Sequence, residues 1–132
     1  MTLEIHPGDC YLINFPSNPT RHLQVVITSV EENTGNFVMV GIESVHKRSD
    51  RTTILHPNEH PFIKRDSAIA YRLADVYSLK WLQEKIESGN ADKKEPMPLD
   101  VLKRICDGLL SSDQTRQRVR EFYINATWKL ES

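Results

Sequence analysis

The sequence lacks the features that mark several classes of protein. It contains only two cysteines, Cys10 and Cys106, and neither belongs to a CxxC pair, so the spacing does not indicate a cysteine metal site. We expect both to be buried free thiols, because one falls in an apolar strand and the other in an amphipathic helix. No stretch approaches the roughly 18 apolar residues that span a bilayer, and no apolar leader follows the first residue. The expected location is therefore the cytoplasm, with no membrane association.

Signature loops and a large net charge are also absent. The chain has no glycine-rich phosphate loop and no G-x-S-x-G elbow. Its 132 residues carry a formal net charge of -1, so binding of nucleic acid would have to come from a local basic patch. This length suits a single domain over residues 1–132, and no internal repeat divides it.

The first part of the chain has the pattern of short strands. Apolar and β-branched runs separated by turn residues predict strands over residues 9–15, 22–29, 36–44, 51–56 and 66–75. The clearest hairpin joins the second strand to the third across the turn that contains Gly35. Five short strands with turns between them favour a small barrel or curled sheet over a parallel α/β sheet, and place the barrel portion over residues 7–77.

The second part of the chain, residues 78–125, has helical spacing. Apolar residues predict helices over 78–89, 99–110 and 113–128, with a polar linker over 90–98. Ser78 and Asp113 are expected as N-caps, Gly89 as a helix stop and Pro98 as a first helical residue. The predicted fold class is thus mainly β with C-terminal helices: a small barrel followed by two or three helices.

A basic segment suggests where a ligand would bind. Residues 44–65 contain five Lys or Arg but only two acids, together with three histidines, and Arg21-His22 can fold close to them if the hairpin forms. A basic rim with histidines suits a ligand that carries phosphate, although a solvated loop surface would have the same composition. The histidine spacings do not match a metal-ligand pattern, so we predict no metal and no cofactor.

Four segments in order resemble the MazF/PemK family of toxin ribonucleases. They are GDCYLINF, RHLQVVITS, FVMVGIES and KRDSAIAYRLADVYSLKWL, and the resemblance covers residues 7 to 86. The chain departs from the family pattern at several points: His22 stands where the family has proline, and the family's glycine before the arginine is missing. Glu43 precedes Ser44 where the family has threonine, and the segment NEHPFIKRDS is richer than the family's usual loop. The helices near the C-terminus are outside the resemblance.

The resemblance implies a fold and an activity. It implies an SH3-like barrel that acts as a homodimer, cuts single-stranded RNA without a metal through attack of the ribose 2′-OH, and is held in check by an antitoxin protein. By position, Arg21 would be the catalytic arginine and Ser44 the catalytic hydroxyl, with His22 or His60 as a further acid or base. The expected substrate-binding residues are His22, Lys47, Arg48, His60, Lys64 and Arg65.

The loop over residues 56–67 is expected to complete this site. Phe62 and Ile63 are its only large apolar side chains, so we expect them to hold the loop against the barrel. That arrangement would leave His60, Lys64 and Arg65 facing a groove near Arg21. The alternative is a purely structural loop, in which His60 hydrogen-bonds the backbone and Asp66 caps the next turn.

Two other functions are compatible with the same sequence. One is a non-catalytic barrel that binds a protein partner or nucleic acid. The other is a regulatory or phage-defence component whose helices dock elsewhere.

Overall fold

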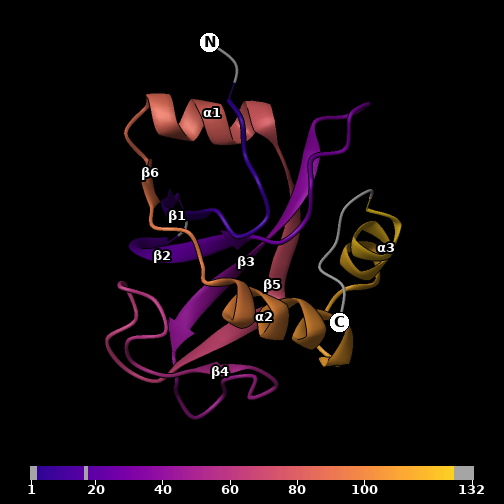
Figure 1. Ribbon diagram of the computed structural model, residues 1–132. Coiled ribbons are helices and arrows are strands. Elements are labelled where there is room, and N and C mark those ends of the chain that lie inside the picture. Colours follow the sequence, from indigo (N-terminus) through magenta and orange to yellow (C-terminus); the bar gives the residue numbers. More distant parts are fainter. Residues whose placement is uncertain (1–2, 17, 127–132) are drawn as a thin grey trace.

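A six-stranded antiparallel sheet forms the centre of the molecule. The computed structural model describes residues 3–16 and 18–126, and it orders the strands β4-β5-β3-β2-β1-β6 in a curled half-barrel (Figure 1). The elements are β1 Cys10–Phe15, β2 Asn18–Val26, β3 Asn36–Ser44, β4 Ile54–Leu55, β5 Ser67–Ser78, α1 Leu79–Glu87, β6 Ala91–Lys94, α2 Leu99–Ser111 and α3 Gln117–Asn125. The predicted class, a curled antiparallel sheet followed by helices, is confirmed.

One strand lies where a linker was predicted. β6 pairs antiparallel with β1, from Cys10 opposite Lys94 to Ile13 opposite Ala91. Its sequence, ADKK, has a single apolar residue and therefore gives no alternating signal. Charged side chains are common on edge strands because they discourage pairing with other chains, and β6 is an edge of the sheet.

The helix ends follow the sequence signals in part. The Ser78 hydroxyl accepts a hydrogen bond from the Trp81 amide at 3.1 Å, and Gly89 adopts a φ of 77° after α1, so both ends of this helix were predicted correctly. The predicted cap Asp113 is wrong, because α3 begins later and its N-cap is Arg116. The predicted third helix also included residues 127 and 128, which lie outside the described residues.

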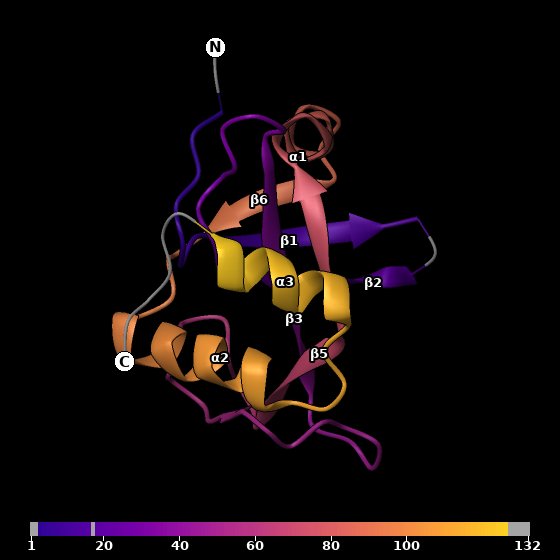
Figure 2. The same cartoon turned by 90° about the vertical axis from the view of Figure 1, so that its right-hand side faces the viewer.

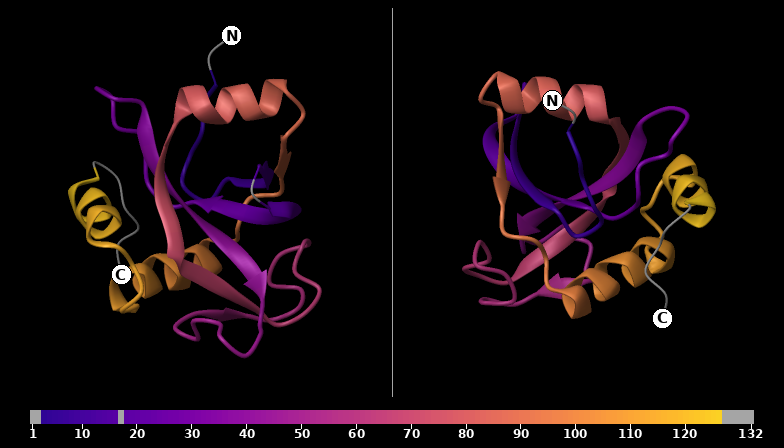
Figure 3. Two further views of the ribbon diagram at one scale, coloured as in Figure 1. Left: turned by 180° about the vertical axis from the view of Figure 1, so that it is seen from behind. Right: turned by 45° about the horizontal axis from the view of Figure 1, so that its top comes forward.

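Alternation along the strands divides the core into two faces. On one face, Leu23, Val25, Val38 and Val40 pack with the apolar sides of α2 and α3, which lie in front of the sheet in Figure 2. On the other face, Phe37, Met39 and neighbouring side chains pack against α1, which lies across one end of the sheet (Figure 3). Because α1 has only nine residues, it covers this second face only in part.

Both cysteines are enclosed in the first of these cores, as predicted. Cys10 and Cys106 are free thiols with at most 1% of their surface exposed. Burial raises their pKa values to about 12 and about 11 respectively. In the described part of the chain, no helix has the length and apolar character needed to cross a membrane.

The closest approach between α2 and the sheet generates the first prediction. A Cβ atom on Gly108 would lie 2.1 Å from the Tyr71 hydroxyl oxygen, which donates a hydrogen bond to the carbonyl of Ile105 at 2.7 Å. We expect Gly108→Ala to lower the free energy of unfolding by about 1–3 kcal/mol, because α2 has to move away from β5. Urea unfolding measures the change, with Asp107→Ala on the exposed side of the same helix as control. Equal stability of Gly108→Ala and the unaltered protein would contradict this packing.

Candidate functional site

Two hollows lie next to each other where the sheet is incompletely covered. The first, which we call the basic groove, has a volume of about 210 Å³ and is lined by the start of β2, the end of β3 and residues 62–65. The second, which we call the sheet pocket, has a volume of about 340 Å³ and lies on the α1 face of the sheet. His22, Ile42 and Glu43 line both hollows, so the two are continuous.

The basic groove forms because two paired strands separate. β2 and β3 are paired from Val26 opposite Met39 to Gln24 opposite Gly41, and the pairing ends there. Continuing that register would set Arg21 opposite Ser44, but β2 instead follows β1 while β3 continues beside β5 (Figure 1). The ends of the two strands therefore form the walls of a groove.

Five of the residues predicted as a site line this groove. They are Arg21, His22, Ser44, Lys64 and Arg65. Lys64 and Arg65 are exposed, and neither makes an ion pair with another described residue. The other two predicted cations, Lys47 and Arg48, are exposed in the loop after β3 and do not line the groove.

Arg21 is already engaged within the protein. Its guanidinium donates to the carboxylate of Asp92 at 2.6 Å and to the carbonyl of Gly89 at 2.8 Å. Both side chains of the ion pair are partly exposed, at 33% for Arg21 and 54% for Asp92. Exposed pairs of this kind typically contribute only about 0.2–1 kcal/mol, so an anionic ligand can compete with Asp92 for the guanidinium.

The expected position of His60 is wrong. Its side chain is buried, at 1% exposed, and does not face the groove. The ring Nε2 lies 2.6 Å from the Glu95 carbonyl and the ring Nδ1 accepts a hydrogen bond from the Phe62 amide at 3.0 Å. These two contacts connect the loop to the segment before α2, so His60 has the structural role that was the alternative for this loop.

The apolar anchors of the loop were predicted half correctly. Ile63 is buried in the core and fixes the loop, as expected. Phe62 is 42% exposed and lines the basic groove, so it does not anchor the loop. His60 takes the place expected of Phe62, because a buried ring with both nitrogens hydrogen-bonded holds the loop as firmly as an apolar contact.

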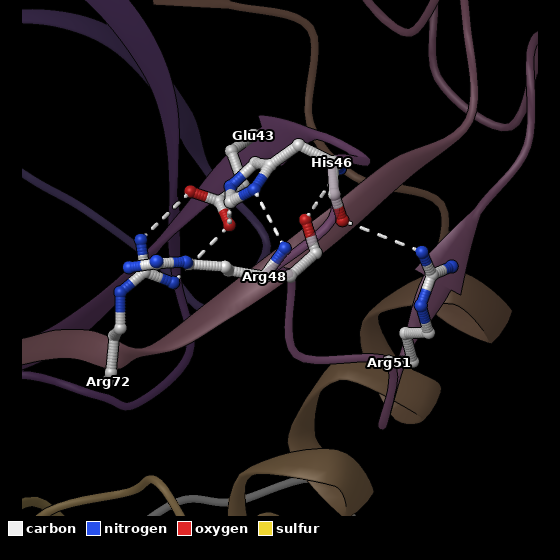
Figure 4. Close-up of polar contacts among 6 residues, drawn as sticks. Glu43, His46, Arg48, Arg51 and Arg72 are labelled. Carbon is white, nitrogen blue, oxygen red and sulfur yellow. Dashed lines mark hydrogen bonds and ion pairs between the residues drawn. The ribbon is translucent and has the colours of Figure 1, made fainter.

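A charged cluster at the junction of the two hollows was missed from the sequence. The Glu43 carboxylate, 14% exposed, lies 3.2 and 3.3 Å from the two terminal guanidinium nitrogens of Arg72 and 3.3 Å from Nε2 of His46 (Figure 4). The His46 Nδ1 accepts from the Arg48 amide at 3.2 Å, which leaves the Nε2 proton directed at Glu43. This arrangement combines an acid, an imidazole and a guanidinium, the groups used in proton transfer and phosphate binding.

A sequence signal for part of this cluster existed. In a strand every second residue faces the same side, so Glu43 shares a face with Gly41, and His22 shares a face with Gln24. Arg72 could not be assigned in the same way, because the register of β5 against β3 shifts between Met39 and Gly41. In the part of the chain that the structure describes, no group of three or more His, Cys, Asp or Glu side chains is arranged to hold a metal ion.

Comparison with known proteins adds no family assignment. A scan against models of protein families finds no match. A search of curated proteins finds no significant similarity.

The buried position of His60 generates the second prediction. We expect His60→Ala to lower the free energy of unfolding by about 1–3 kcal/mol, because it leaves the Glu95 carbonyl and the Phe62 amide without partners. The matched control is His56→Ala, since His56 is an exposed histidine of the same loop whose ring lies 3.0 Å from Asp66. Thermal melts of both variants measure the difference. A larger loss of stability in His56→Ala than in His60→Ala would contradict the assignment.

Proposed function

We propose that the protein is a metal-independent endoribonuclease that cuts single-stranded RNA in the basic groove. The observation that carries the proposal is that three separate segments of the chain contribute polar side chains to one groove: Arg21 and His22, Ser44, and Lys64 and Arg65. A local group of cations of this kind can bind phosphate groups. The resemblance to the MazF/PemK toxins supports the same activity, although it rests on the sequence alone.

The reaction requires charge stabilisation at one phosphate. The ribose 2′ oxygen attacks the adjacent phosphorus, the bond from phosphorus to the 5′ oxygen breaks, and the products carry a 2′,3′-cyclic phosphate and a 5′-hydroxyl. In this proposal Arg21 leaves Asp92 and donates to the phosphate oxygens, while the Ser44 hydroxyl donates where negative charge develops. Lys64 and Arg65 hold the neighbouring phosphates.

The reaction also requires two proton transfers. A base has to take the proton of the 2′-OH, and an acid has to give a proton to the departing 5′ oxygen. Glu43 and His22 are the proton-transfer side chains that line the groove itself. We assign the base to Glu43, which His46 and Arg72 hold in place, and the acid to His22.

The same proposal extends to partners and location. By resemblance we propose that the protein acts in the cytoplasm as a homodimer, and that an antitoxin protein occupies the groove when the enzyme is inactive. The exposed cations Lys47 and Arg48 would then contact RNA or the antitoxin beyond the groove.

A second function is favoured by the state of Arg21. The guanidinium that the reaction needs already donates hydrogen bonds to Asp92 and Gly89 within the protein. A barrel that binds RNA or a protein partner through its exposed cations, without cleaving, would keep such a contact intact. The regulatory or phage-defence role suggested by the sequence belongs to this second function.

Cleavage assays with single-stranded RNA generate the third prediction. We expect cleavage that persists in excess EDTA and leaves 5′-hydroxyl ends, which polynucleotide kinase labels without prior phosphatase treatment. Arg21→Ala should lower the rate by about a hundredfold or more, because a donor to the transition-state charge is removed.

A matched arginine provides the control. Arg118 is also an exposed arginine paired with an aspartate, Asp75, but it lies on α3 and does not line the groove. We expect Arg118→Ala to cleave at the rate of the unaltered protein. Full activity of Arg21→Ala would remove this residue from the mechanism. Binding of RNA without cleavage of any sequence would favour the second function.

A further inference from the structure

Two small residues, Gly41 and Ala70, line the sheet pocket side by side. Across the sheet, Tyr11 lies opposite Gln24, Gln24 opposite Gly41, and Gly41 opposite Ala70. Among the described residues, none from a helix lines the pocket beside Gly41 and Ala70. A glycine in a strand interior often marks a place where a ligand comes close to the backbone. The pocket's volume of about 340 Å³ is within the range of roughly 300–1,000 Å³ typical of small-molecule sites.

Gln24 is a largely buried residue whose side-chain amide has no partner among the described residues. The residue is only 7% exposed, and it lines the pocket with its side chain lying over Gly41. No other described residue makes a hydrogen bond with the side-chain amide. Every fully enclosed side-chain nitrogen or oxygen among the described residues does have a partner, so the Gln24 amide atoms must reach the open space of the pocket. Water in the pocket can bond the amide in the free protein, and a ligand that supplies the same hydrogen bonds would replace that water.

The opposite side of the pocket is aromatic. Phe15 and Tyr77 line it, with ring centroids 6.4 Å apart, and Trp81 of α1 packs behind both at 5.9 and 4.7 Å. Leu73, which is 58% exposed, lies at the rim. Planar apolar side chains next to a hydrogen-bonding amide suit a flat heterocycle that has polar groups along its edge.

We propose that the sheet pocket binds a nucleobase, and that the Gln24 amide selects adenine. A glutamine amide offers one acceptor and two donors side by side, which match the N6 amino group and the N7 acceptor of adenine. The pocket and the basic groove share His22 and Glu43, so a base bound here belongs to a nucleotide next to the phosphate in the groove. This specificity rests on the proposed action on single-stranded RNA, but the pocket itself does not depend on cleavage.

Binding can be measured separately from cleavage with 2′-O-methyl oligonucleotides, which lack the attacking hydroxyl. The probes are a single-stranded oligo-U and versions with one central A, G or C, titrated at fixed salt. We expect the unaltered protein to bind the A-containing probe about tenfold more tightly than oligo-U, as one bidentate contact to a base would give.

Two variants test the role of the amide. Gln24→Met keeps the side-chain length but removes the amide, and we expect it to lose the preference for A while still binding oligo-U through the groove. Gly41→Ala places a Cβ 2.9 Å from the Gln24 amide nitrogen, so it should also reduce the preference by displacing the side chain. The control, Gln114→Met, changes an exposed glutamine outside the pocket and should keep the preference.

Stability measurements show whether a variant that loses base preference is still folded. Because the amide has no internal partner, Gln24→Met should melt at the temperature of the unaltered protein or above it. A preference for another base, a preference that survives in Gln24→Met, or equal binding of all four probes would overturn the proposal. Base preference that depends on Gln24, in a protein that cleaves no natural RNA, would reject the ribonuclease and retain the pocket. Cleavage that is independent of Gln24 and of the adjacent base would support the ribonuclease and reject the base-binding pocket.

Discussion

The unequal covering of the sheet's two faces determines the rest of the structure. Alternation places apolar side chains on both sides of β3, so both faces need a partner layer. Helices α2 and α3 supply one layer, whereas on the other face the short α1 buries only the end near Phe37 and Met39. The residue types change along β3 in the same way. On the face that α1 covers, the apolar residues Phe37 and Met39 are followed by Gly41 and then Glu43. Polar and small residues therefore occur where the helix cover ends.

Both hollows follow from that change of cover. A strand with no helix above it needs no large apolar side chain, and past Gln24 and Gly41 the two central strands also stop pairing with each other. The separation opens the basic groove, and the small floor residues open the pocket beside it. Glu43 lies at the boundary of the two, where Arg72 and His46 compensate its partly buried charge. The candidate site is thus a region of the sheet where charged and small side chains replace the large apolar side chains of the core.

The sequence predicted features that depend on neighbours along the chain. The strand alternation, the turn at Gly35 and the cap at Ser78 are local, and each was predicted correctly. Contacts between segments that are distant in the sequence could not be predicted from such local signals. The strand pairing of Ala91–Lys94 and the burial of His60 against Glu95 depend on which segments meet in space, and neither leaves a periodic pattern. That Arg21 and Ser44 line one groove was accessible, because both lie just beyond the paired part of one hairpin, whereas Arg72 required the register shift in β5.

The pairing of β1 with β6 also constrains how the chain is made. β1 forms its hairpin with β2 early, because the two are adjacent in sequence, but its other edge meets β6 about eighty positions later. While the ribosome is still producing the intervening chain, that edge carries unpaired amides and carbonyls beside an apolar strand, CYLINF. Such an edge can pair with a second chain, so the period in which aggregation is favoured lasts until β6 has left the ribosome and paired with β1.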